Sequence, residues 1–277
     1  MDMHRDELGL FIAGRIRAEA AGLRQMWREA QPVKHFFIDD LLPADDALRI
    51  SRSFPAPDQL NLKSSLRERK RTGVEVNRYA PCIGECLFAF QQPAVIEAIA
   101  EVTGLEGLEA DPTLYASGVS LMGKGDFLNP HIDNSHDGDR ARYRLLNLLF
   151  YVSPDWRAEN GGNLELWDEQ IRRPHTVLSR FNRLVVMLTN QRSWHSVNKV
   201  QVEAPRRCVS NYYFAMKPAS ETAYLNVTSF AGRPEERVKR LLLKLDAAVL
   251  NALGKTFPQL TKLTRHRLPT DGSAKKK

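Results

Sequence analysis

Two histidines and one aspartate in this sequence have the spacing of a metal site. His131 and Asp133 lie two residues apart in the stretch LNPHIDNSHDGDR, and in an extended segment that spacing places both side chains on one face. His195 follows the apolar run RLVVMLT. Two imidazoles and one carboxylate can hold Fe(II) on one side and leave positions open for a substrate and O₂. The three residues therefore predict a metal site of the oxygen-activating kind.

Other charged residues near this stretch have a simpler interpretation. His136 competes as a second histidine, but it lies in the turn NSHDGD, which is rich in Gly and Asp, so we expect it to be a solvated loop residue. Arg140, Arg142 and Arg144 alternate just before an apolar strand. They could recognise an acidic substrate, but we expect them to form a solvated face.

Oxygen chemistry at such a site needs an electron donor, and the usual donor is a keto-dicarboxylate whose far carboxylate binds a fixed cation. Arginine suits this task because its planar fork can contact a carboxylate at two points. The stretch EAPRRCVSNYYF places Arg206 and Arg207 at the start of the strand after His195. Side chains alternate along a strand, so Arg206 shares one face with Cys208 and Ser210. Only one of the two arginines can point into a barrel, and the alternation alone does not decide which.

The motifs together resemble the Fe(II)- and 2-oxoglutarate-dependent oxygenases, in particular their prolyl 4-hydroxylase-like branch. The resemblance covers about residues 113 to 216 and rests on four stretches in family order: HIDN, NLLFYVSPDWRAENGGNLELWD, SRFNRLVVMLTNQRSWHSV and PRRCVSNYYF. It implies an α+β protein with a double-stranded β-helix, a jelly-roll of two facing sheets whose inner face holds the metal. N-terminal helices and an amphipathic, basic C-terminal helix would be added to this core.

The resemblance also assigns roles to residues. It makes His131, Asp133 and His195 the catalytic iron ligands, with 2-oxoglutarate as the cosubstrate, O₂ as the oxidant and ascorbate as the reductant. Its contacts with 2-oxoglutarate would come from one face of the barrel, from Arg206, Tyr151, Asn147 and Ser210. Arg207 stays as the alternative to Arg206, because the eleven residues from His195 to Arg206 exceed the family's usual gap.

The reaction implied by the resemblance is the hydroxylation of an unactivated C–H bond, with release of succinate and CO₂. Hydroxylation and desaturation are both open. The expected substrate is a lipid-linked or cell-surface sugar or a small metabolite, and the alternative is a protein prolyl hydroxylase. A non-catalytic jelly-roll binding module is a further class, but such a module would have lost a ligand, and the sequence retains all three.

Composition limits the protein class. With 277 residues, of which 43% are hydrophobic, the chain can bury a sizeable core. No apolar run reaches the ~18 residues of a membrane span, and Met1 to Glu7 carries acids where a secretory signal would be basic. We therefore expect a cytoplasmic protein. The cysteines are few and widely spaced, which predicts buried thiols rather than disulfides: Cys82, Cys86 and Cys208.

The chain divides into three sections that differ in composition and in the spacing of their apolar residues. We expect a helical and mixed extension packed on the core over 1–112, the oxygenase jelly-roll over 113–218, and a basic helix and tail over 219–277. Within the first section, apolar periodicity predicts helices over 5–30 and 92–103. The polar segment from Leu62 to Gly73 reads as a mobile loop.

The positive charge of the chain is concentrated at its C-terminal end. Residues 233–277 contain twelve Lys and Arg against four Asp and Glu, a net of +8 in a chain whose formal charge is +7. The core therefore has no net positive charge, and the tail has few aromatics, so no nucleic-acid partner is expected. An amphipathic helix beginning at Pro234 would either pack on the core or rest peripherally on an anionic membrane. The sequence does not indicate the oligomeric state.

Overall fold

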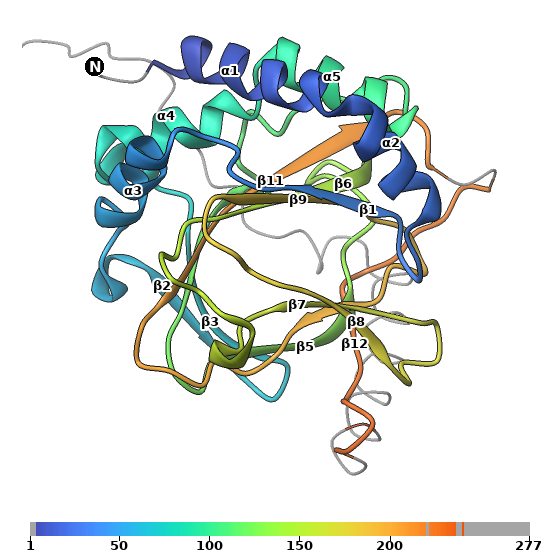
Figure 1. The fold of residues 1–277 in the computed structure, drawn as a ribbon. Coiled ribbons are helices and arrows are strands. Elements are labelled where there is room, and N and C mark those ends of the chain that lie inside the picture. The colour runs from blue at the N-terminus through green and yellow to red at the C-terminus, as the bar shows by residue number, and fades with distance from the viewer. Residues whose placement is uncertain (1–3, 220–221, 237–239, 241–277) are drawn as a thin grey trace, which may run out of the picture.

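Helices cover one outer face of a curled β-sheet (Figure 1). The computed structural model describes residues 4–219, 222–236 and 240. The helices found among these residues are α1 (Arg5–Ala18), α2 (Ala20–Glu29), α3 (Ala44–Arg52), α4 (Pro81–Ala89) and α5 (Pro93–Thr103).

The ends of these helices follow local sequence signals. Pro81 and Pro93 occupy the first turns of α4 and α5, where a missing N–H costs nothing. Gly104 ends α5 with a φ of 71°, a left-handed conformation that glycine adopts without strain. The predicted helix over 92–103 is confirmed. The one predicted over 5–30 is two helices, divided at Glu19.

The strands belong to one antiparallel sheet that folds back on itself. They are β1 (His35–Ile38), β2 (Asn61–Ser64), β3 (Glu68–Gly73), β4 (Gly118–Met122), β5 (Phe127–Ile132), β6 (Tyr143–Tyr151), β7 (Leu164–Trp167), β8 (Pro174–Val177), β9 (Arg183–Leu188), β10 (His195–Val197), β11 (Arg206–Ala215) and β12 (Ser229–Phe230). Their order is β1-β9-β6-β11-β4-β3-β5-β10-β7-β8, while β12 pairs with β5 and β2 pairs with β3.

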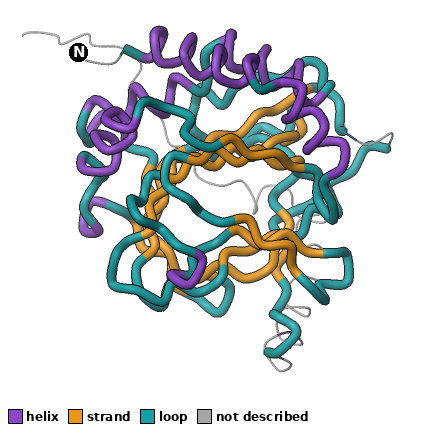
Figure 2. The backbone as a smooth tube through the Cα atoms, in the orientation of Figure 1, coloured by secondary structure: helices purple, strands orange, loops and turns teal. Residues whose placement is uncertain are grey.

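The sheet has two halves that face each other (Figure 2). One half runs from β1 to β4 and lies beneath the helices, and the other contains β5, β10, β7 and β8. Strand β3 joins the halves, because it pairs with β4 at one end and with β5 at the other. This is the double-stranded β-helix that the sequence predicted, with helices on its outside. The predicted α+β fold class is confirmed.

The segment from Leu62 to Gly73, predicted as a mobile loop, is instead the hairpin of β2 and β3. Its charges alternate between the two faces of β3. Arg69 Nε lies 2.9 Å from Asp126 Oδ1 on one face, and Lys70 Nζ lies 3.0 Å from Glu68 Oε2 on the other. High polarity suggested a loop, but a strand can carry charges on both faces when each face supplies partners.

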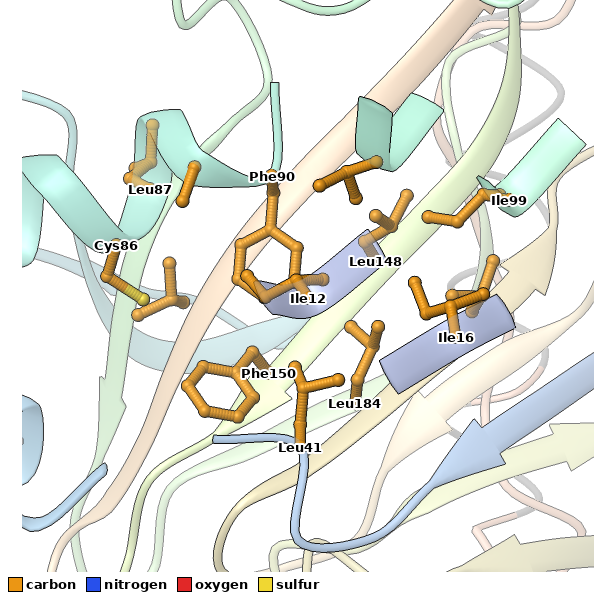
Figure 3. Packing of buried hydrophobic residues seen from close by; sticks show 14 of the residues in the cluster. Ile12, Ile16, Leu41, Cys86, Leu87, Phe90, Ile99, Leu148, Phe150 and Leu184 are labelled. Atoms are coloured by element: carbon orange, nitrogen blue, oxygen red, sulfur yellow. The ribbon is translucent and has the colours of Figure 1, made fainter. Parts of the chain in front are cut away.

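The main hydrophobic core lies between the helices and the outer face of the sheet (Figure 3). Phe150 and Leu148 on β6 pack there against helical residues such as Ile12. Each such side chain contributes about 1.5–3 kcal/mol when fully buried. Leu149 and Tyr151 alternate with them and belong to a second cluster on the inner face. The outer contacts therefore fix β6 so that its alternate side chains face the interior of the barrel.

The three predicted sections remain a prediction. Strands β1, β2 and β3 lie within 1–112 and pair into the same sheet as the strands of 113–218. Of the predicted C-terminal helix over 233–255, all but 233–236 and 240 lies outside the described residues.

Candidate active site

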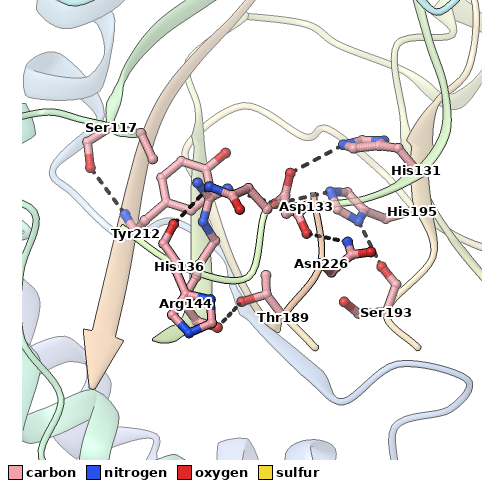
Figure 4. Close-up of polar contacts among 12 residues, drawn as sticks. Ser117, His131, Asp133, His136, Arg144, Thr189, Ser193, His195, Tyr212 and Asn226 are labelled. Carbon is pink, nitrogen blue, oxygen red and sulfur yellow. Dashed lines mark hydrogen bonds and ion pairs between the residues drawn. The ribbon is translucent and has the colours of Figure 1, made fainter. Parts of the chain in front are cut away.

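The register of β5 and β10 brings two predicted ligands together. His131 and His195 are direct cross-strand partners, and Asp133 follows β5 by one residue. His131 Nε2 lies 3.5 Å from Asp133 Oδ1, and His195 Nε2 lies 3.7 Å from Asp133 Oδ2 (Figure 4). One atom of each residue falls within 4.8 Å of the others. The three side chains can thus bind one metal ion.

Backbone contacts orient both histidines. His131 Nδ1 lies 3.0 Å from the Asn129 carbonyl, and His195 Nδ1 lies 2.9 Å from the Ser193 carbonyl. A carbonyl only accepts, so each Nδ1 carries the proton and each Nε2 keeps its lone pair for a metal. Burial, followed by repulsion from His131, lowers the pKa of His195 to about 4. The imidazole of His195 is therefore neutral at pH 7 and can act as a ligand.

A buried arginine keeps the third ligand ionised. Arg144 Nη1 lies 3.3 Å from Asp133 Oδ2, and both side chains are largely buried. Burial by itself acts to raise the pKa of Asp133, but Arg144 and the two histidines outweigh it and hold that pKa well below its usual range. The Arg144 guanidinium also lies 4.4 Å from the centre of the Tyr212 ring. Asp133 is therefore a carboxylate that is ready to bind a cation.

The prediction that Arg144 belongs to a solvated face is wrong. Alternation from Tyr151 backwards along β6 would put Arg144 on the outer face, but the strand has an irregularity near its start. Leu146 pairs with Tyr213, whereas Arg144 pairs with Phe214. The extra residue in β6 reverses the alternation and turns Arg144 inward. Arg142 is partly exposed and pairs with Asp137 and Glu109.

His136 is not a solvated loop residue either. It is only 7% exposed, its Nδ1 lies 2.7 Å from Ser135 Oγ, and its ring centre lies 4.2 Å from that of Tyr143. His136 therefore holds the loop after Asp133 in place. It is not part of the ligand group formed by the other two histidines.

Arg206 and Tyr151 lie together on the inner face. The Arg206 guanidinium is buried 4.7 Å from the centre of the Tyr151 ring, and its Nε lies 3.4 Å from Ser179 Oγ. Among the described residues no carboxylate pairs with it. Burial raises the pKa of the Tyr151 hydroxyl to about 12, so this group is a neutral donor. The pair is suited to bind a carboxylate.

Gly162 makes room for this arginine. Its φ of 66° is left-handed, and a Cβ added there would lie 3.1 Å from Arg206 Cδ. The sequence indicated only a turn at the Gly161 and Gly162 pair. The structure shows that Gly162 also lies against the predicted cosubstrate anchor.

The other predicted contacts lie on expected faces, and their roles remain predictions. Asn147 pairs with Tyr212 across β6 and β11, on the same inner face as Tyr151. Ser210 is also inward, with its Oγ 3.7 Å from Cys208 Sγ. Arg207 is on the opposite face from Arg206, paired with Leu121 on β4, which favours Arg206 as the anchor.

Unsatisfied polar atoms test whether iron and 2-oxoglutarate fit this site. Four buried atoms around the triad have no well-formed hydrogen bond within the part of the chain that is described: Asp133 Oδ2, Arg144 Nε, Asn147 Oδ1 and the Tyr151 hydroxyl. Buried polar atoms are normally satisfied. A cation beside Asp133 and a dicarboxylate between the triad and Arg206 would supply partners, so the residues fit both groups.

A C-terminal segment, which sequence reasoning missed, braces the site. Phe230 on β12 stacks on the His131 ring, with centres 5.2 Å apart and an angle of 17°. Asn226 Nδ2 donates to the Asp133 carbonyl at 3.0 Å. Arg233 Nη2 lies 2.6 Å from Glu165 Oε2. These contacts join residues 68 to 99 positions apart, and no local pattern indicates them.

Comparisons with known proteins agree with this geometry. Residues 117–215 match the model of the 2OG-Fe(II) oxygenase superfamily, whereas no curated protein sequence matches the chain. Among solved structures, a prolyl-4-hydroxylase of Pseudomonas putida is 19% identical, with a TM-score of 0.51, and the match covers 70% of this chain and 99% of that one. Prolyl 4-hydroxylases of Phytophthora capsici are 17% identical, with a TM-score of 0.54, and the match covers 92% of this chain and 80% of that one.

A third structural relative was solved with iron and alpha ketoglutarate bound. The epimerase SnoN, in complex with Fe³⁺, alpha ketoglutarate and nogalamycin RO, is 14% identical, with a TM-score of 0.52, and the match covers 79% of this chain and 87% of that one. The family match runs from the start of β4 to the end of β11 and contains all three candidate ligands. Residues 117–215 therefore match the 2OG-Fe(II) oxygenase superfamily, and they contain the candidate iron ligands of a dioxygenase that depends on Fe(II) and 2-oxoglutarate.

Proposed function

We propose that the protein hydroxylates an unactivated C–H bond of a small molecule or a glycan. The observation that carries the proposal is the combination of the triad with a buried Arg206 on the same inner face, which has no carboxylate partner among the described residues. A bound Fe(II) ion would supply O₂ activation, driven by the decarboxylation of 2-oxoglutarate to succinate. The proposed ligand set and anchor both belong to this chain.

The protein's own residues prepare the site for this reaction. His131, Asp133 and His195 would hold the ion from one side, and Arg144 keeps Asp133 ionised. Arg206 would bind the far carboxylate of 2-oxoglutarate, with Tyr151, Asn147 and Ser210 as further contacts. Phe230 and the surrounding inner face exclude water, which strengthens the ionic contacts.

A protein prolyl hydroxylase is the alternative. Two of the three structural relatives described above are prolyl 4-hydroxylases, but at below 20% identity the likeness concerns the fold. SnoN has the same fold and is named an epimerase. A non-catalytic jelly-roll module is not favoured, because the chain retains a histidine or aspartate at all three ligand positions and brings their side chains together.

A succinate-release assay tests the proposal. The protein is incubated with Fe(II), 2-oxoglutarate and ascorbate, and with separate panels of sugars and lipid-linked sugars, small metabolites and prolyl peptides. We expect one of the first two panels to raise succinate release above the substrate-free rate. Mass spectrometry should then show one added oxygen atom, whereas loss of two hydrogens would indicate desaturation. Stimulation by prolyl peptides alone would establish the alternative.

We further propose that the basic tail contacts an anionic membrane peripherally, in a cytoplasmic protein. None of the helices in the described part of the chain has the length and apolar character needed to cross a membrane. The support is the charge of residues 233–277, since each Lys or Arg near an anionic surface contributes ~1 kcal/mol.

Liposome sedimentation tests whether the basic tail binds an anionic membrane. We expect the full-length protein to sediment with anionic liposomes and to be released by salt, while a protein truncated after Glu236 stays in the supernatant. The truncation has to keep Phe230 and Arg233, because both contact the core. Equal behaviour of the two proteins would remove the membrane contact.

A further inference from the structure

The hairpin of β2 and β3 places charged side chains on the inner face of the barrel. Thr72 on β3 is paired with Ser120 on β4, and Ser120 is paired with Cys208 on β11. Directly paired residues share a face, so Thr72 faces inward with Cys208. Lys70 and Glu68, two and four residues before Thr72, therefore face inward as well.

These two residues lie beside the triad. Glu68 is paired with Leu128 on β5, three residues before His131. Burial acts to raise the pKa of Glu68, but Lys70 and Lys63 outweigh it, with a smaller contribution from His131. The positive charge of Lys70 in turn acts to lower the pKa values of His195 and Cys208. The inner face of β3 thus lies between the metal ligands and the strand that carries Arg206.

A second lysine stands opposite the first. Lys63 on β2 is the direct cross-strand partner of Lys70, an arrangement in which like charges repel. Lys70 pairs with Glu68 at 3.0 Å, but Lys63 makes no ion pair among the described residues. The Lys63 side chain is exposed, but desolvation by the surrounding protein, followed by repulsion from Lys70, still lowers its pKa. Lys63 and Lys70 therefore have a single carboxylate, that of Glu68, to balance their two charges.

On the opposite face of the hairpin, two cations likewise share one carboxylate. Arg69 and Arg71 there flank Asp126, which is buried and also accepts the Gly123 N–H. Lys63 and Lys70, unlike these two arginines, lie on the inner face, where their N–H groups can donate to a bound substrate. An oxyanion bound between Lys63 and Lys70 would remove their repulsion and accept charge-assisted hydrogen bonds.

We propose that Lys63 and Lys70 bind a carboxylate or phosphate group carried by the substrate of this dioxygenase. The inference rests on the proposed function and narrows it to anionic substrates. Glu68 positions Lys70 and competes with the incoming anion. Arg206 lies on β11, which β4 separates from the hairpin, and it remains available for 2-oxoglutarate.

Calorimetric titration with inorganic phosphate tests the proposal. The full-length protein is loaded with Mn(II) in place of Fe(II) and with 2-oxoglutarate, so that both other sites are filled. We expect saturable binding, weakened about 10-fold by Lys63→Met or by Lys70→Met, since each removes a hydrogen bond to a charged group. Glu68→Gln should strengthen binding, because it removes the competing carboxylate, and a purely structural role would not produce that gain.

Lys124→Met is the matched control, because Lys124 is an exposed lysine that pairs only with exposed Glu203. It should bind phosphate as the wild type does. Lys63→Met covers the case in which Lys70→Met disturbs folding, since Lys63 has no ion pair of its own to lose. Unchanged phosphate affinity in Lys63→Met would overturn the proposal.

Two further measurements locate the anion. Mn(II) should broaden the phosphorus NMR signal of phosphate held near the triad, and binding without broadening would place the anion elsewhere and overturn the proposal. Titration with 2-oxoglutarate should be unaffected by Lys63→Met; a loss there alone would assign the lysine to the cosubstrate and also overturn it. Failure to bind Mn(II) would instead remove the iron site, and phosphate titration of the metal-free protein would still test both lysines.

Discussion

Replacing His131 with alanine is expected to abolish 2-oxoglutarate turnover while the protein stays folded. Even the loss of an outer partner of a metal ligand costs about 10–100-fold in affinity or activity, so removal of a ligand should cost at least as much. His131→Ala leaves the ion pair of Asp133 with Arg144 intact. The measurements are succinate release and the Fe(II) dissociation constant, with His175→Ala, an exposed histidine on β8, as the control.

Asp133→Ala should remove turnover equally but also destabilise the protein. It leaves the Arg144 guanidinium buried without its carboxylate, and breaking a buried ion pair from one side costs about 3–5 kcal/mol. Denaturant unfolding of the metal-free variants should therefore separate Asp133→Ala from His131→Ala. Full turnover in either variant would contradict the iron site, and equal stability of the two would contradict the role given to Arg144.

Arg206→Ala is expected to raise the KM for 2-oxoglutarate by about 10- to 100-fold, whereas Arg207→Ala should change it little. A hydrogen bond to a charged group contributes about 1.5–3 kcal/mol, and each 1.4 kcal/mol corresponds to about tenfold in affinity. Arg206 is buried on the inner face beside Tyr151, while Arg207 is on the opposite face and only half-buried. Steady-state kinetics with 2-oxoglutarate as the varied substrate is the measurement. The reverse pattern would move the anchor to Arg207.

The triad could be found from the sequence because its geometry is mostly local. His131 and Asp133 keep the two-residue period of an extended chain, and His195 begins a strand that the apolar run before it made recognisable. The same period along β11 grouped Arg206 with Cys208 and Ser210, but the choice of that face as the inner one came from the family resemblance. Regular strands transmit a side-chain direction reliably over a few residues, so these inferences needed no tertiary information.

Arg144 and the hairpin were missed because their positions depend on partners far away in the sequence. One extra residue in β6 reverses the face of Arg144, and nothing in RYRLLNLLFY marks where it is inserted. The charges of β3 become a strand pattern only when β4, β5 and Asp126 are present. Polar composition in isolation resembles a loop.

The bracing of β5 has a consequence for how the protein folds during synthesis. His131 is flanked by His195 and by Phe230, and β1, near the N-terminus, pairs with β9, so that His35 meets Met187. Such non-local pairings delay folding, because long loops must close before their contacts form. A chain emerging from the ribosome therefore cannot complete this site until residues near 230 have left the exit tunnel. Metal binding is then a late event, and iron cannot serve as an early template for the barrel.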